Sequence, residues 1–366
     1  MPVSSAENAR WTSTNYQQAR EVAMAQIVLG LGTSHTPLFT LDSSEWQHRA
    51  AADFANPKLN LSDGRWLNYS RLLGEVGPQY ADAARPEELQ RKSVLCEAAL
   101  DRLADALEAA KPDVVLIVGD DQGELFGPAN QPAFAICHAD ALVTSDMYGH
   151  ETSPEWIRKM GRGYLMDVRH TIRGASDYAL KLIDGLMNEG VDVATVARME
   201  EDTKAGLGHA FGFIVKRLFR QRSIPMVPLL LNTYYPPNVP TAARCHDIGM
   251  ALRRVIEADE SPTRIAIIAS GGLSHFVVDA ELDQRVIGAF VNRDSNVLRG
   301  LPRCALNSGS SEILNWVLAA GAVDRLAVQW KEYLPLYRTP AGTGVGAAFV
   351  IWGDVPVGKV LPSIVA

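Results

Sequence analysis

The chain has few cysteines, and their spacing forms no recognisable pattern. Four occur in 366 residues, Cys96, Cys137, Cys245 and Cys304, and they lie far apart with no CxxC pair. A disulfide framework or a zinc ribbon needs closely and regularly spaced cysteines, so neither is predicted. We therefore expect a protein of a reducing compartment, the cytoplasm.

Long hydrophobic runs and clusters of positive charge are also missing. No stretch reaches the roughly 18 consecutive apolar residues of a membrane span, and segment 1–23 has no apolar signal-peptide core. The net charge is -7, and no Lys/Arg-rich run has interleaved aromatic residues. Such a chain would repel a phosphate backbone, so we expect neither a membrane nor a nucleic acid as a partner.

Three common functional motifs are absent as well. The phosphate-binding GxxxxGK[ST] and the dinucleotide-binding GxGxxG do not occur. The nucleophile motif GxSxG is absent too, because Ser270 precedes the two glycines of its SGG sequence instead of lying between glycines. The sequence thus gives no indication of a nucleotide-binding protein or a serine hydrolase.

What the chain does contain is a regular alternation of strand and helix patterns. Apolar residues make up 47% and charged residues 21%, as in soluble globular enzymes. This alternation predicts a single three-layer α/β/α domain around a mixed, largely parallel sheet. The predicted strands are 26–32, 114–118, 133–136, 191–196, 226–232, 265–269 and 346–352, and the predicted helices are 86–110, 177–189, 211–219, 242–258 and 310–320.

The domain boundaries follow from where this alternation begins and ends. We expect an N-terminal extension over 1–25, a catalytic domain over 26–356 and a C-terminal tail over 357–366. Segment 41–85 is polar, carries several Trp and Tyr residues and lacks clean periodicity. It is predicted to be a partly helical insertion beside the functional site.

Polar residues stand directly after several predicted strands, where ligands bind in α/β folds. Taken singly, each has a structural alternative. A histidine at a strand end is usually hydrogen-bonded, a carboxylate in a first helical turn meets the helix dipole, and DDQGE can be a solvated turn. The candidates are His35, Asp120, Asp121, Gln122, Ser274 and His275 after strands, Glu312 in a first helical turn, and His209 after Gly206 and Gly208.

The motifs around these residues, taken together, resemble one family. In order along the chain they resemble the catalytic subunit of protocatechuate 4,5-dioxygenase and its relatives, the LigB-like class III extradiol ring-cleaving dioxygenases. The resemblance covers most of 27–354. The motifs are GTSHTP (32–37), PDVVLIVGDDQ (112–122), PAFAI (132–136), GLGH (206–209), YPP (235–237), ARCHDIG (243–249), SGGLSH (270–275), SGSSEILNW (308–316) and GTGVGAAFV (342–350).

This resemblance implies a metal centre and assigns roles to four residues. In the family, two histidines and one glutamate hold a non-haem Fe(II), and further histidines act on the substrate. His35 falls on the first ligand and Glu312 on the carboxylate ligand. His275 falls on the catalytic acid/base, a role that suits an imidazole because its pKa lies near neutrality, and His209 falls on a second substrate-site histidine.

The chain departs from the family pattern at one ligand. Where the family has its second histidine ligand, this sequence has Gln122. The amide oxygen of glutamine can bind a metal but is a weaker donor than imidazole. Another divalent metal in place of Fe(II) is therefore an alternative. His138 is the nearest alternative by position, ahead of His170 and His150.

Two enzyme functions and one non-enzymatic function follow. The first is an Fe(II)-dependent extradiol dioxygenase that cleaves a catecholic or gallate-like aromatic compound with O2. The second is a metal-dependent hydrolase or lyase on the same scaffold, and the third is a binding protein that has lost its metal. The expected partners are the aromatic substrate, O2 and a second copy in a homodimer. Relatives cover their site with a small helical subunit or a fused segment, and here the cover would be 41–85 or a partner chain.

Overall fold

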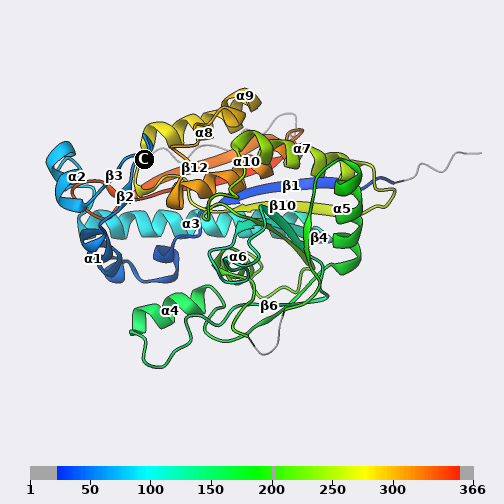
Figure 1. Ribbon diagram of the computed structural model, residues 1–366, viewed down its shortest axis with the longest axis horizontal. Coiled ribbons are helices and arrows are strands. Elements are labelled where there is room, and N and C mark those ends of the chain that lie inside the picture. Colours follow the sequence, from blue (N-terminus) through cyan, green and yellow to red (C-terminus); the bar gives the residue numbers. More distant parts are fainter. Residues whose placement is uncertain (1–22, 200–202, 355–366) are drawn as a thin grey trace, which may run out of the picture.

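The computed structural model describes residues 23–199 and 203–354, and in them the chain forms one nine-stranded sheet with helices on both faces (Figure 1). The strand order is β11-β13-β1-β10-β4-β9-β5-β8, and β12 pairs with β13. The strands are β1 Gln26–Thr33, β4 Val114–Asp120, β5 Phe134–Cys137, β8 Ala194–Val196, β9 Met226–Leu231, β10 Arg264–Ser270, β11 His275–Val277, β12 Ala327–Tyr337 and β13 Thr343–Gly353.

The centre of the sheet consists of four neighbouring parallel strands, β1, β10, β4 and β9. All seven residues of β4 are buried, as expected for a parallel strand covered by helices on both faces. The strands toward both edges are antiparallel to their central neighbours, β13 to β1 and β5 to β9. This mixed sheet within a single α/β domain confirms the predicted fold class.

Helices cover both faces and create two hydrophobic cores. On one face, apolar residues of α5, α7, α8 and α10 pack on the sheet (Figure 1). On the other face those of α3 and α6 do so, and α4 packs outside α6 in the same core. The chain therefore has the three layers predicted from its sequence. The helices are α3 Pro86–Ala110, α4 Glu155–Gly163, α5 Ser176–Asn188, α6 His209–Arg217, α7 Ala242–Glu257, α8 Ala280–Asn292, α9 Ser295–Arg299 and α10 Ile313–Ala322.

The segment 41–85, predicted to be a partly helical insertion, folds into short helices and a small hairpin. It contains the short helix η2 Ser43–Glu45, the helices α1 Gln47–Ala55 and α2 Tyr69–Val76, and the small hairpin β2 Leu59–Asn60 and β3 Trp66–Leu67. The Asn60 side-chain amide donates to the backbone oxygens of His275 at 2.8 Å and Asn307 at 3.1 Å. These bonds attach the insertion to the strand that begins at His275 and to the loop residue Asn307.

Element boundaries differ from the prediction where local patterns are weak. β8 starts at 194 instead of 191, α6 starts at His209, and α10 starts at Ile313 after a short η3 helix, Ser308–Glu312. The long strand β12 was not predicted, because it is only partly buried and contains charged residues. Two short strands, β6 Ala141–Val143 and β7 Thr171–Arg173, form a separate pair.

The predicted extension and tail lie almost wholly outside the described residues, since only 23–25 of the extension are described and the tail begins after 354. In the described part of the chain, no helix combines the length and the apolar character needed to cross a membrane.

Gly32, near the end of β1, tests the packing of the sheet against α10. A Cβ atom at this position would lie 2.0 Å from the Cζ3 atom of Trp316, so even alanine forces the buried indole to move. We expect Gly32→Ala to destabilise the protein by about 3 kcal/mol, a typical cost of overpacking. Urea unfolding measures this loss.

Gly74 in α2 supplies the matched control. A Cβ there meets nothing within 4 Å, so Gly74→Ala should stabilise the helix by about 0.5–1 kcal/mol. If Gly32→Ala unfolds at the same urea concentration as the wild type, β1 and α10 do not pack as described.

Candidate metal centre

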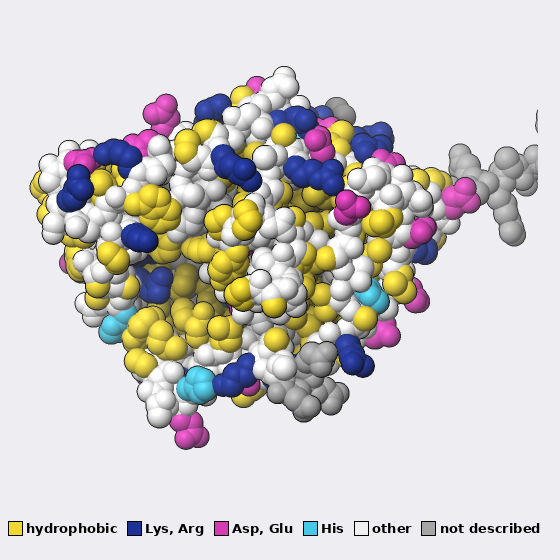
Figure 2. Space-filling view, in the orientation of Figure 1, with side chains coloured by type: hydrophobic (Ala, Val, Ile, Leu, Met, Phe, Trp, Pro, Cys, Tyr) yellow, Lys and Arg dark blue, Asp and Glu magenta, His cyan; other side chains and the backbone are white. Residues whose placement is uncertain are grey.

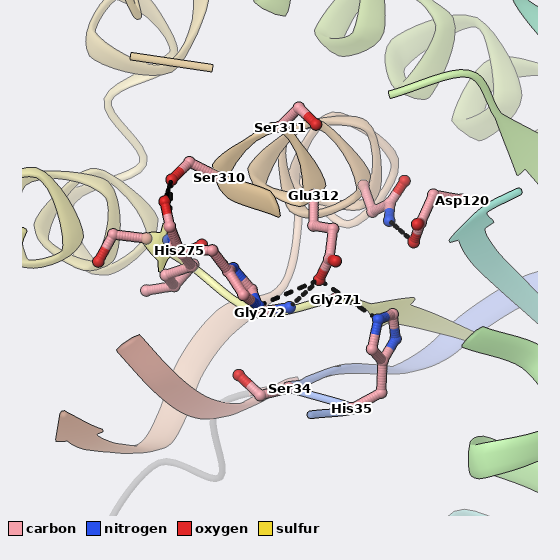
Figure 3. Close-up of polar contacts among 12 residues, drawn as sticks. Ser34, His35, Asp120, Gly271, Gly272, His275, Ser310, Ser311 and Glu312 are labelled. Carbon is pink, nitrogen blue, oxygen red and sulfur yellow. Dashed lines mark hydrogen bonds and ion pairs between the residues drawn. The ribbon is translucent and has the colours of Figure 1, made fainter. Parts of the chain in front are cut away.

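Four buried side chains converge at one end of the parallel strands. His35, Asp120, His209 and Glu312 each place one potential ligand atom within 4.8 Å of the others. Figure 3 shows His35, Asp120 and Glu312 pointing toward one another from separate elements. Two imidazoles and two carboxylates in one buried group are the side chains expected of a transition-metal site.

The sheet topology explains why residues far apart in sequence meet here. β1, β10 and β4 are adjacent and parallel, so their carboxyl ends lie at the same edge. Asp120 is the last residue of β4, and His35 stands two residues after β1. His209 begins α6, and Glu312 is the N-cap of α10, so two helix N-termini complete the group.

The tautomer of His35 is fixed by a short chain of hydrogen bonds. The Ser270 hydroxyl donates its single proton to the backbone oxygen of Ala210 at 2.6 Å. Ser270 Oγ must therefore accept the 2.9 Å hydrogen bond from His35 Nδ1, which carries the imidazole proton. In the neutral imidazole, Nε2 of His35 is therefore the nitrogen without a proton, and it is buried without a hydrogen-bond partner.

This nitrogen faces a carboxylate, an arrangement that suits a bound cation. His35 Nε2 lies 3.3 Å from Oε2 of Glu312. In the tautomer that Ser270 imposes, two lone pairs face each other in a buried space, which is unfavourable unless a positive charge lies between them. A divalent cation at the group fits this arrangement.

The carboxylates of the group support the same conclusion. Burial raises the pKa of Asp120, and the negative charge of Glu312 raises it further. Burial acts in the same direction on Glu312, but attraction to the protonated forms of His275 and His35 outweighs burial and lowers the pKa of that carboxyl. Two carboxylates this close do not ionise together easily, and a bound cation would stabilise both as anions.

His209 is oriented by Glu124 in a way typical of metal ligands. Its Nδ1 hydrogen-bonds Oε1 of Glu124, and its Nε2 points toward Asp120, 4.0 Å from Oδ2. Metal-binding histidines usually donate their second ring nitrogen to such a carboxylate. Burial would lower the pKa of His209, but Glu124 outweighs burial and raises it to about 10. A metal at Nε2 would therefore displace a proton, and its affinity would weaken in acid.

Gln122 lies at the edge of the group. Its amide nitrogen donates to Asp120 Oδ2 at 3.0 Å and faces Glu312 Oε1 at 3.4 Å. Asn315 donates to the other oxygen of Asp120 at 3.2 Å, so two amides hold that carboxylate. Metal binding by the Gln122 amide oxygen would require this amide to turn over.

His275 stands beside the group with one ring nitrogen available. Its Nδ1 donates to the backbone oxygen of Leu273 at 2.9 Å, so Nε2 carries a lone pair, 3.9 Å from Oε2 of Glu312 (Figure 3). Two glycines leave space for His275, since a Cβ at Gly272 or Gly309 would lie 2.1 Å or 2.5 Å from His275 atoms. Burial lowers the pKa of His275, although Glu312 opposes this shift, and the imidazole is neutral at pH 7.

The structure shows where the three alternative histidine ligands considered from the sequence lie. His138 lies after β5, where its backbone bonds Val196 and Ser176. His170 pairs with Asp167, and His150 contacts Lys204. None of the three belongs to the buried group. Glu124, in the DDQGE sequence that could have been a solvated turn, is instead a buried partner of His209, and only its spacing after β4 hinted at this.

Comparison with known proteins shows which sequences the chain resembles. The family model described as the catalytic LigB subunit of aromatic ring-opening dioxygenase matches residues 81–349. The chain is similar to the 2,3-dihydroxyphenylpropionate/2,3-dihydroxicinnamic acid 1,2-dioxygenase of Burkholderia vietnamiensis, with 28% identity over 209 residues that cover 57% of this chain and 54% of the relative. The enzyme of the same name from Comamonas testosteroni is 26% identical over 211 residues, again 57% and 54% of the two chains.

A relative with a different substrate in its name also matches. The gallate dioxygenase of Pseudomonas putida is 30% identical over 132 residues, which cover 33% of this chain and 38% of the relative. The matched region thus spans about half the length of the dihydroxyphenylpropionate enzymes and less of the gallate enzyme.

Metal titration of variants tests the site without any assumption about the reaction. We expect His35→Ala and Glu312→Ala each to weaken Fe(II) binding more than about 100-fold, because removing even an outer partner of a ligand costs 10–100-fold. The affinity is measured by titrating metal-free protein under argon, with Co(II) absorption as a second readout.

His138→Ala is the matched control, since it removes a histidine that lies outside the buried group. It should bind metal like the wild type. Full metal binding by both His35→Ala and Glu312→Ala, or loss of metal in His138→Ala alone, would contradict the assignment.

Proposed function

Because the chain belongs to the family of catalytic LigB subunits of aromatic ring-opening dioxygenases, we propose that it is a non-haem Fe(II)-dependent extradiol dioxygenase. It would cleave the ring of a catecholic or gallate-like aromatic compound with O2. The observation that carries the proposal is the buried group of two histidines and two carboxylates beside the available nitrogen of His275. Two histidines and one carboxylate with open positions are typical of non-haem Fe(II) oxygenases.

We propose His35, His209 and Glu312 as the residues that would hold the iron. The lone pair of His35 Nε2, the orientation of His209 by Glu124 and the lowered pKa of Glu312 support this set. His209 would then supply the second imidazole, in place of the substrate role predicted from the family resemblance. When bound, iron would bring the aromatic diol and dioxygen together and allow electron transfer between them.

Gln122, predicted as a ligand, would act through hydrogen bonds instead. Its amide nitrogen lies 3.0 Å from Asp120 Oδ2 and would keep that carboxylate in place beside the ligands. Asp120 itself could accept a proton or support His209. A direct metal bond from Gln122 remains the alternative.

His275 is proposed as the acid/base residue. Its Nδ1–H is fixed on Leu273, so Nε2 can take the proton of a substrate hydroxyl and later return it. The lowered pKa keeps the imidazole unprotonated at neutral pH, ready to act first as a base. Gly272 and Gly309 leave the ring space in this orientation, because a side chain at either position would collide with it.

The second candidate function, a metal-dependent hydrolase or lyase, depends on Gln122 and Asp120. A site with Gln122 where the family has an imidazole, and with the second carboxylate of Asp120 beside it, suits metals that do not activate dioxygen. Turnover of an aromatic substrate under strict anaerobiosis would favour this alternative over the dioxygenase.

The proposal also covers the location, the oligomeric state and the partners of the protein. We infer a cytoplasmic homodimer whose small-molecule partners are the aromatic substrate and O2, with the catalytic domain over 26–356. The four cysteines, all present as free thiols, support a reducing compartment. The insertion bonded to the His275 backbone through Asn60 supports a cover formed by the chain itself.

Substitution of His275 separates proton transfer from metal binding. We expect His275→Gln to keep the metal and the fold while lowering kcat by about 10²–10⁴, the usual contribution of general acid–base catalysis. Oxygen uptake with a panel of catechols and gallate measures turnover, and metal analysis of the same sample provides the control. Loss of metal together with activity would show that His275 is a ligand instead of a base.

A further inference from the structure

Arg49, in helix α1 of the insertion, carries a charge that the described chain does not neutralise. Its Nε atom is buried without a hydrogen-bond partner, and its guanidinium has no hydrogen bond or ion pair within 23–199 and 203–354. The nearest acid along the helix, Asp53, is already engaged. Asp53 accepts two hydrogen bonds from Arg338, at 2.7 Å and 3.0 Å, and one from the Thr343 hydroxyl at 2.8 Å.

Two tyrosines link Arg49 to the metal centre. Tyr148 and Tyr164 both lie close enough to Arg49 to act on its pKa. The Tyr164 hydroxyl donates to the backbone oxygen of His35 at 2.7 Å, and its ring contacts the edge of His209 with centroids 5.6 Å apart. Tyr164 therefore lies within electrostatic range of Arg49 and in contact with the two histidines of the buried group.

The surface of the molecule is hollowed in this region. Figure 2 shows a hollow with hydrophobic walls in the area where Figure 1 places α1, α4 and α6, and a basic side chain is visible in it but no acidic one. Since Nη1 and Nη2 of Arg49 also lack partners but are not fully buried, they remain accessible to a ligand. An apolar hollow with one polar anchor is suited to an aromatic molecule with a charged substituent.

The combined charge of Arg49, Arg338 and Asp53 favours the binding of an anion. Arg49 and Arg338 contribute two positive charges and Asp53 one negative charge, which leaves an excess of one positive charge. Burial, and then the charge of Arg338, lower the pKa of Arg49, but a guanidinium stays protonated at neutral pH. An unpaired charge in a partly buried place lowers stability, and such costs are common where a ligand supplies the counter-charge.

We propose that Arg49 binds a carboxylate of the substrate, so that the enzyme acts on aromatic acids in preference to neutral catechols. This inference rests on the proposed function. The planar guanidinium fork matches the two oxygens of a carboxylate. The diol end of the substrate would then lie at the buried group and its carboxylate at α1, with Tyr148 and Tyr164 along the aromatic ring. The insertion would thus take part in substrate binding as well as in covering the site.

Binding to matched acids and esters tests this directly. The probes are 3,4-dihydroxybenzoate, 3-(2,3-dihydroxyphenyl)propionate and their methyl esters, titrated calorimetrically into iron-loaded protein under argon, where ring cleavage cannot occur. We expect Arg49→Gln to weaken binding of at least one acid about ten- to hundred-fold, as for loss of a charged hydrogen-bond pair. Binding of the corresponding ester should change less than about threefold, and Arg49→Lys should lie between the two.

Two controls separate binding from folding. Arg71→Gln removes an exposed arginine of α2, in the same insertion, and should leave all affinities unchanged. Because Arg49 has no partner among the described residues, Arg49→Gln should unfold at the same temperature as the wild type or at a higher one.

The possible results distinguish this inference from the proposed function. If the acids bind the wild type and Arg49→Gln binds them equally well, the inference is wrong and the dioxygenase proposal stands. Equal weakening of acids and esters together with a lower unfolding temperature would show that Arg49 is structural, which also overturns the inference. If the wild type binds neither acids nor esters, both proposals fail.

Discussion

The site depends on the contact between Nε2 of His35 and a carboxylate oxygen of Glu312, 3.3 Å apart. Ser270 can donate only one proton, which goes to Ala210, and it therefore fixes the imidazole with its lone pair toward Glu312. Both groups are buried, so their repulsion is not screened by water. A cation at this point relieves it. The other residues of the site are arranged around the same point, with His209 held by Glu124 and Asp120 held by two amides.

Much of this arrangement was predictable from the sequence, because it depends on where strands end. His35, Asp120 and His275 follow apolar runs that become β1, β4 and β10, and adjacent parallel strands bring their carboxyl ends together. The family motifs supplied the remaining members, His209 and Glu312. The fold class followed from the same alternation of strands and helices, although this pattern did not predict the half-buried strand β12.

What the sequence could not provide was the pairing of side chains across the fold. Glu124 looked like part of a solvated turn, and only tertiary packing places it against His209, 85 residues later. The family motif placed Gln122 at a ligand position. The sequence could not show that its amide nitrogen instead faces Asp120 and Glu312, because that depends on how the amide is oriented in the fold. Arg49 lay in a segment without periodicity, and its lack of a partner is visible only once Asp53 is seen to pair with Arg338.

The central claim, that one metal ion binds among His35, His209 and Glu312, is tested most directly by anomalous diffraction. Crystals soaked with Fe(II) under argon and measured on both sides of the iron absorption edge show where the ion lies. The account predicts a single strong peak within bonding distance of His35 Nε2 and a Glu312 oxygen, about 2.0–2.2 Å as for nitrogen and oxygen ligands of divalent metals. A peak elsewhere in the molecule, or no peak at saturating Fe(II), would contradict it.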